Sequence, residues 1–199
     1  YFGLVYDDTI ITESIFVDLV DAHPRILAVK IDGATKEDYA WGFRVGFLTY
    51  GAQGLSADAL KALEDKTAGA VRGNISNASH LSQSLLLAAY EDGDYQSWKG
   101  EKFQVLKARY DRVCQILADH PEYSESFEPL PFNSGYFMCV RPKSAEPEKI
   151  RKCLLAEFDT GVIATSGLIR VAFSSAPSQV LPALFENLHR ACQMVDSAP

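Results

Sequence analysis

The sequence predicts an α/β protein in which a sheet-containing region is followed by a long connecting helix and a second α/β region. Three observations predict this fold class. The apolar run from Ile26 to Ile31 is typical of a mostly buried strand. The segment from Tyr95 to His120 repeats its apolar residues with helical spacing. After Pro121, short strand patterns alternate with helical ones. We therefore expect regions at 1–94, 95–120 and 121–199.

The first region is expected to contain a helix followed by two strands. A short helix is predicted from Ser14 to Ala22, with Thr12 or Ser14 as its cap. The strand at 26–31 follows, and its nearly continuous apolar character suggests a sheet covered on both faces. Residues 33–36 form a turn of small residues, and a second strand runs from Phe43 to Tyr50 until glycines end it. Lys36 consequently lies on a tight connection between two strands.

Helical spacing dominates the next part of the chain. Ser56, or Asp58 beside it, caps a helix that runs to Val71 and that Gly73-Asn74 is expected to break. Ser79 begins another helix, His80 to Glu91. The helix from Tyr95 to His120 presents apolar residues on one face and charged residues on the other. Its length suits a helix that bridges two domains.

The third region is predicted to be an α/β layer with antiparallel character, because its strands are short and follow one another closely. Its expected strands are Phe127–Phe132, Tyr136–Val140, Gly161–Ala164 and Leu168–Ser174, and its helices are Pro147–Phe158 and Val180–Val195.

Composition excludes several classes of protein. Of 199 residues, 47% are hydrophobic and 23% charged, which is the balance of a globular chain. The net charge is −7 and the basic residues are dispersed, which disfavours nucleic acid as a partner. No apolar stretch approaches the roughly 20 residues of a membrane span. The four cysteines lack the CxxC spacing and accompany only four histidines, so neither a metal site nor a disulfide framework is expected. A reducing, cytoplasmic location fits best.

The segment from Asp32 to Gly46 carries the most chemical information. It places Lys36 on a turn of small residues after a strand, where ligands of open α/β sheets collect, and Arg44 follows eight positions later. A partly desolvated lysine beside an arginine favours the neutral amine, which can attack a carbonyl. A guanidinium suits a bidentate phosphate contact. Together they provide what an aldehyde cofactor bearing a phosphate requires. On spacing alone, an exposed turn lysine and an ordinary strand-end arginine are the alternative.

This segment resembles the Schiff-base lysine motif of the class I/II pyridoxal-phosphate-dependent aminotransferases, fold type I. The residues that carry the resemblance are Lys36, Gly42, Arg44, Val45 and Gly46. Two positions depart from the pattern: Gly33 stands where a phosphate-binding serine is frequent, and Tyr39 stands where the family has a small residue. Thr35 could supply the missing hydroxyl.

Further segments resemble the same family in the same order. Tyr1-Phe2-Gly3-Leu4 is similar to the end of an Asp-x-Ala-Tyr segment, which makes Tyr1 the residue that binds the cofactor's phenolic oxygen. Arg72 to Asn77, with Ser76, resembles a stretch that reaches across a dimer interface towards the partner's cofactor phosphate and substrate. Gly167 to Phe173 resembles the strand whose arginine, here Arg170, binds the substrate α-carboxylate, and Asn133 to Phe137 resembles the strand before it.

Each of these residues also has a simpler explanation. Tyr1 could pack on a sheet, Arg72 could complement the dipole at a helix C-terminus, Ser76 could cap the next helix, and Arg170 could pair across its sheet. The histidines at 23, 80, 120 and 189 have no catalytic context and are expected at the surface or at helix ends. Trp41 and Trp98 are expected to be core or interface anchors.

The resemblance implies the end of the large-domain sheet of a pyridoxal-phosphate transferase followed by the small C-terminal α/β domain. It also implies a homodimeric aminotransferase that moves an amino group between an amino acid and a 2-oxo acid through a Schiff base on Lys36, with Lys36 then acting as the proton-transferring base. The cofactor-pairing aspartate would lie just before Tyr1, so the chain is expected to be a C-terminal portion. A carbon–sulfur lyase or related β-eliminating enzyme, or a non-catalytic ligand-sensing domain, remains an alternative.

Overall fold

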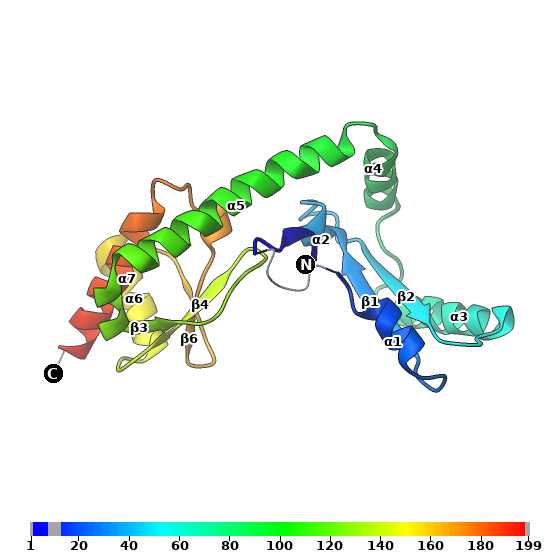
Figure 1. Ribbon diagram of the computed structural model, residues 1–199, viewed down its shortest axis with the longest axis horizontal. Coiled ribbons are helices and arrows are strands. Elements are labelled where there is room, and N and C mark those ends of the chain that lie inside the picture. Colours follow the sequence, from blue (N-terminus) through cyan, green and yellow to red (C-terminus); the bar gives the residue numbers. More distant parts are fainter. Residues whose placement is uncertain (1, 8–12, 198–199) are drawn as a thin grey trace. The chain divides into compact units, whose positions relative to one another are not determined.

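A computed structural model describes residues 2–7 and 13–197 (Figure 1). The predictions made for Tyr1 and Thr12 fall outside the described residues. The chain divides into two compact units, residues 1–100 and 101–199. The boundary between them lies within one long helix, α5 (Tyr95–Asp119), which confirms the helix predicted there.

The first unit is built from a strand hairpin and several helices. Its elements before α5 are the 3-10 helix η1 (Phe2–Leu4), α1 (Phe16–Ala22), β1 (Ala28–Gly33), α2 (Ala34–Glu37), β2 (Gly46–Gly51), α3 (Ala57–Asn74) and α4 (His80–Glu91). Helix α4 has the bounds that the sequence predicts. Helix α3 runs three residues beyond Val71 and ends at Asn74, within the predicted Gly73-Asn74 break.

Serine side chains cap α3 and α4, as predicted. The Ser56 hydroxyl accepts a hydrogen bond from the Ala59 amide at 3.2 Å, and the Ser79 hydroxyl accepts one from the Ser82 amide at 3.3 Å. Helix α1 starts two residues later than expected, and its N-cap position is Ile15, so the prediction that Ser14 is the cap is wrong; the Ser14 hydroxyl still accepts a hydrogen bond from the Phe16 amide at 3.2 Å. Each hydroxyl satisfies one of the free amides of a helix N-terminus.

Strands β1 and β2 pair antiparallel, in a register that runs from Ala28 opposite Gly51 to Gly33 opposite Gly46. The prediction of a mostly buried strand is wrong here, since Ile31 is 80% exposed and Val29 is 49% exposed. An apolar side chain favours burial, but it becomes buried only where a neighbouring element covers it. Within the described residues this sheet has two strands. The second strand also begins later than predicted, at Gly46, because Arg44 adopts a left-handed φ of 56° that interrupts extended backbone.

Two aromatic residues of this unit are also more exposed than predicted. Trp41 is 73% exposed and Trp98 is 48% exposed, so neither is a core residue of the described structure. Their role as interface anchors remains a prediction.

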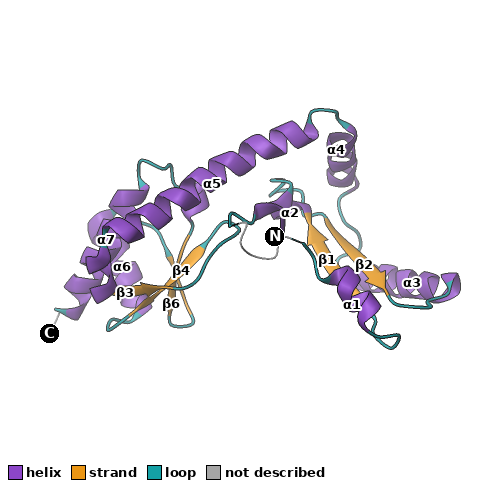
Figure 2. Cartoon of the chain, in the orientation of Figure 1, coloured by secondary structure: helices purple, strands orange, loops and turns teal. Residues whose placement is uncertain are grey.

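The second unit is an antiparallel sheet with helices. Its elements after α5 are η2 (Pro121–Glu125), β3 (Phe127–Pro129), β4 (Met138–Pro142), α6 (Pro147–Phe158), β5 (Ile163–Thr165), β6 (Leu168–Val171), η3 (Phe173–Ser175) and α7 (Leu181–Asp196). The strand order is β3-β4-β6-β5 and every pairing is antiparallel, which confirms the predicted character. Helix α6 contacts β5 and β6 of this sheet and also packs against α7; Figure 2 labels both helices in the same unit as β3, β4 and β6.

The core of the second unit is mostly apolar. Helix α6 has the predicted bounds, and its Ile150 and Leu154 are completely buried, as are Phe185 and Leu188 of α7. Strands β3, β5 and β6 are shorter than predicted, and β3 ends at Pro129, before Pro131 is reached. Strand β4 has its predicted length but lies two residues later in the chain. From α5, the predicted apolar face contributes Leu106, Val113 and Ile116 to buried positions.

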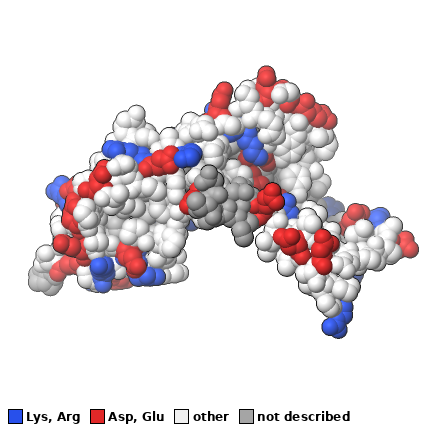
Figure 3. All heavy atoms as spheres, viewed as in Figure 1, with Lys and Arg blue, Asp and Glu red and all other residues white. Residues whose placement is uncertain are grey.

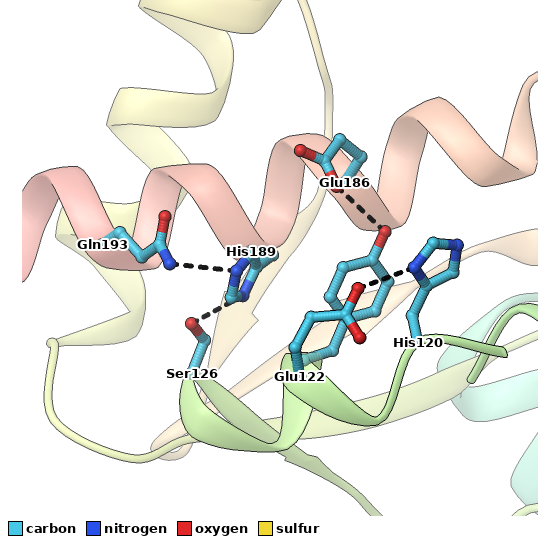
Figure 4. Close-up of polar contacts among 7 residues, drawn as sticks. His120, Glu122, Ser126, Glu186, His189 and Gln193 are labelled. Carbon is cyan, nitrogen blue, oxygen red and sulfur yellow. Dashed lines mark hydrogen bonds and ion pairs between the residues drawn. The ribbon is translucent and has the colours of Figure 1, made fainter. Parts of the chain in front are cut away.

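His189 corrects the expectation that all four histidines lie at the surface or at helix ends. It is buried in α7, only 9% exposed, and both ring nitrogens have partners (Figure 4). The Ser126 hydroxyl lies 2.8 Å from Nδ1, and the Gln193 side-chain amide lies 2.9 Å from Nε2. Ser126 is itself 5% exposed. A serine and a histidine at this distance resemble a nucleophile and its base, but their burial leaves no access for a substrate, so the pair is a polar part of the core.

The charges and thiols of the described residues are those of an ordinary globular protein. Figure 3 shows acidic and basic side chains interspersed over the visible face. The cysteines at 114, 139, 153 and 192 are free thiols. Among the described residues, His, Cys, Asp and Glu side chains form no group placed to hold a metal ion. In the same part of the chain, every helix is too short or too polar to span a bilayer.

Candidate functional site

Lys36 lies on α2, a single helical turn that joins the two strands of the first unit. The sequence predicts a turn of small residues here, and the structure has one turn of helix. Its first residue, Ala34, is fully buried and its amide donates to the Val45 carbonyl at 3.2 Å. The Asp38 and Ala40 amides both donate back to the Ala34 carbonyl. Small residues allow this compact turn, which fixes the backbone on both sides of Lys36.

A cavity of about 470 Å³ opens where β1 ends. Three residues predicted to form the site, Lys36, Thr35 and Arg44, line it together. The Arg44 Nη1 donates to the Thr35 hydroxyl at 3.4 Å, so a guanidinium and a hydroxyl lie side by side. The remaining lining residues are Ser14, Lys30, Ile31, Asp32, Gly33 and Glu37. Because both Arg44 and Thr35 have further hydrogen-bonding capacity, the pair can bind an anion.

Sequence reasoning missed four polar residues of this cavity: Ser14, Lys30, Asp32 and Glu37. Lys30 and Asp32 form an ion pair of 3.1 Å, with side chains about one-third exposed. Their alternation within an apolar run places them on one face of the strand, which was an available signal. The cavity wall therefore combines lysine and arginine cations with carboxylates.

The structure shows the surroundings of Gly33 and the backbone of Tyr39, the two positions that depart from the family motif. A Cβ at Gly33 would meet no heavy atom within 4 Å, so packing does not require glycine there. The hydroxyl beside Arg44 comes instead from Thr35. Tyr39, the second departure, has a left-handed φ of 56°, which a bulky residue rarely adopts.

Arg72 and Ser76 contact each other but do not line the Lys36 cavity. Arg72 lies in the last turn of α3 and its Nη1 donates to the Ser76 hydroxyl. Ser76 has a left-handed φ of 69° and does not cap α4, since Ser79 does. The alternative explanation of Ser76 as a helix cap is therefore wrong. Arg72 is placed where a cation complements the helix dipole.

Arg170 belongs to the second unit, on strand β6 between the buried residues Ile169 and Val171. Its cross-strand neighbours are Cys139 and Ile163. The guanidinium carbon lies 4.6 Å from the centroid of the Phe137 ring. A cation over an aromatic face is attracted to it, so the ring holds the guanidinium in place while its N–H groups stay available.

Solved structures similar to this chain are aminotransferases. A kynurenine aminotransferase of Pyrococcus horikoshii aligns with a TM-score of 0.74 and 14% identity, covering 98% of this chain and 46% of that one. An α-aminoadipate aminotransferase of Thermus thermophilus aligns with a TM-score of 0.72 and 16% identity, covering 98% and 49%. An aminotransferase of Anaerococcus prevotii aligns with a TM-score of 0.66 and 21% identity, covering 81% and 38%.

No protein-family model and no curated protein matches the sequence. The chain spans about half or less of the length of the aminotransferases that it matches, which is the share expected for a C-terminal portion. The fold of this chain is therefore that of the fold type I aminotransferases, as the sequence motifs predict.

Proposed function

We propose that this chain carries the lysine-bearing part of a pyridoxal-phosphate-dependent aminotransferase, which moves an amino group between an amino acid and a 2-oxo acid. The observation that supports it best is the convergence of Lys36, Thr35 and Arg44 on one cavity. They do so in a chain with the aminotransferase fold.

The donors of this cavity match the chemistry of the cofactor. A phosphate needs hydrogen-bond donors and positive charge, which Arg44 and Thr35 supply together. An aldehyde needs an amine, which Lys36 supplies. The cavity volume of about 470 Å³ falls within the range of small-molecule sites. When bound, pyridoxal phosphate supplies an aldehyde that bonds to a lysine and a ring that accepts electrons from the substrate.

Each residue then has a defined task. Arg44 and Thr35 anchor the phosphate and so fix where the reactive end of the cofactor lies relative to Lys36. Lys36 Nζ takes the proton from the substrate α-carbon and later returns one, acting as general base and then as general acid. Tyr1, outside the described residues, is assigned to the phenolic oxygen of the cofactor.

Arg170 and Arg72 are assigned to the substrate. Arg170 binds the α-carboxylate through the N–H groups that its contact with Phe137 leaves available. Arg72 and Ser76 would act across the interface of a homodimer, Ser76 on the partner's cofactor phosphate and Arg72 on the partner's substrate. The division into 1–94, 95–120 and 121–199 as large-domain end, connecting helix and small domain belongs to the same proposal.

The test uses the full-length protein and a lysine substitution. We expect the parent protein, supplied with pyridoxal phosphate, to absorb visible light, and borohydride to bleach this absorbance and add mass at Lys36. Lys36→Ala should abolish both this labelling and transamination. Lys61→Ala is a matched control, because Lys61 is an exposed lysine of α3 that pairs with Asp65 one turn away.

The outcomes separate the alternatives. Undiminished transamination by Lys36→Ala would refute the role of Lys36. Release of ammonia or thiol without an exchanged amino group would indicate a β-eliminating enzyme instead. A protein that stays colourless with added cofactor would favour a non-catalytic domain.

A further inference from the structure

Four polar side chains gather at the end of the turn that carries Lys36. The Asp38 carboxylate, two residues after Lys36, accepts a hydrogen bond from the Tyr90 hydroxyl at 2.7 Å. Its other oxygen accepts from the Tyr95 hydroxyl and from the Lys99 ammonium, the latter at 3.1 Å. The side chain of Asp38 is only 10% exposed. Residues separated by more than 50 positions thus meet at one carboxylate.

The protonation states of this cluster are well defined at neutral pH. Burial alone raises the pKa of Asp38, but the hydrogen bonds from Tyr95, Tyr90 and Lys99 outweigh it and hold that pKa below its usual range. Burial, together with the Asp38 charge, raises the pKa of both tyrosines. The acceptor is therefore ionised and both phenols are protonated, which is the state in which charge-assisted hydrogen bonds are strongest.

Further contacts join the donors of this cluster to one another. The rings of Tyr90 and Tyr95 meet edge to face with centroids 5.2 Å apart, and the Lys99 ammonium lies 5.7 Å from the Tyr95 ring centroid. Tyr95 and Lys99 are one turn apart on α5 and therefore share a face. Each donor is held by a second contact, so the carboxylate is fixed and not merely solvated.

The opposite end of the turn is anchored by apolar packing. Ala34 packs with Val45 and with Leu86 of α4 in one buried cluster. Leu86 lies one helical turn before Tyr90, so one face of α4 holds both the start of α2 and the residue that follows it. Tyr39, which follows Asp38 in the sequence and precedes Arg44, has a left-handed backbone conformation. Such conformations persist only where the surroundings enforce them.

We propose that Asp38 is a positioning residue for Lys36: by tying the end of α2 to Tyr90, Tyr95 and Lys99, it fixes the direction in which the lysine enters the cavity. Asp38 does not line that cavity and acts through the backbone. The inference rests on the proposed function for the identity of the lysine that reacts with the cofactor. A lysine on an unanchored turn would reach the same cavity in many orientations and react in few of them.

The first experiment measures the reactivity of Lys36 in the full-length protein. Pyridoxal phosphate is added, borohydride is added at intervals, and mass spectrometry follows modification at Lys36 and at the exposed reference Lys152. Asp38→Asn should slow the modification of Lys36 about tenfold and leave Lys152 unchanged. The double variant Tyr90→Phe with Tyr95→Phe should act in the same direction, because it removes two donors and keeps Asp38. Asp65→Asn, which removes an exposed aspartate paired with Lys61, should change neither rate.

The second experiment measures backbone hydrogen exchange without cofactor. In Asp38→Asn the peptide covering 33–41 should exchange about tenfold faster at temperatures well below unfolding, while helix α3 keeps its protection. Loss of stability alone would raise exchange in both segments and would overturn the proposal. Rates at Lys36 and at 33–41 within twofold of the parent in both variants would also overturn it. If the parent is not modified at Lys36 in preference to Lys152, the proposed function fails, and the exchange experiment still decides the anchoring role.

Discussion

Replacing Ser126 by alanine should destabilise the protein through an unsatisfied histidine. The Ser126 hydroxyl lies 2.8 Å from His189 Nδ1, and the two residues are 5% and 9% exposed. Water cannot replace the lost partner at that burial, while the Gln193 contact to the other ring nitrogen stays in place. Leaving one buried polar atom unpaired costs about 1–3 kcal/mol, so we expect about 2 kcal/mol.

The assay is urea unfolding followed by circular dichroism. Ser144→Ala is the matched control, because that serine is exposed and its hydroxyl bonds to Asp196 at the surface. We expect its effect to stay within about 0.5 kcal/mol. In Ser126→Ala with His189→Leu the two losses should not add, since both partners of the bond are removed. A Ser126→Ala protein as stable as Ser144→Ala would refute this account of the buried pair.

Three further predictions concern a thiol, a helix end and a helix start. Burial raises the pKa of Cys192 from 9.0 to about 12. Between pH 9 and pH 12 this thiol is therefore ionised in the unfolded chain and protonated in the folded one. The free energy of unfolding should therefore fall by about 1 kcal/mol from pH 8 to pH 10. Urea titrations of Cys192→Ala should not show this decrease. Asp159 ends α6 exposed, with φ 47°. Thermal unfolding should show Asp159→Gly about 0.5–1 kcal/mol more stable and Asp159→Val less stable. Ser56→Ala should cost about 1 kcal/mol and speed hydrogen exchange at the start of α3, whereas Ser56→Asp should restore both.

The longer helices were predictable because their signals are local. Ser79 and Pro147 mark the beginnings of α4 and α6 within a residue, and both helices have the predicted bounds. Lys36, Thr35 and Arg44 could likewise be placed together, since a short connection between two paired strands keeps its residues close. The chemistry of the candidate site was therefore accessible from one continuous segment.

Features that depend on distant residues could not be predicted in this way. The exposure of Ile31 is set by what lies against its sheet, and the contact between Arg170 and Phe137 follows from how the β4 and β6 segments pack. His189 is hydrogen-bonded to Ser126, 63 positions away in the sequence, and Asp38 is hydrogen-bonded to Tyr95, 57 positions away. Such partners become visible only when the register and packing are known.

Helix α5 determines how this protein can be dissected genetically. A piece that ends at Gly100 would keep Tyr95 and Lys99 on a helical stub of six residues, which is too short to hold its shape alone. A cut before Tyr95 would give the second unit its whole helix. The first unit would then lose Tyr95 and Lys99, which donate hydrogen bonds to Asp38. No single cut leaves both units intact, so each unit has to be produced with the entire helix, in overlapping pieces.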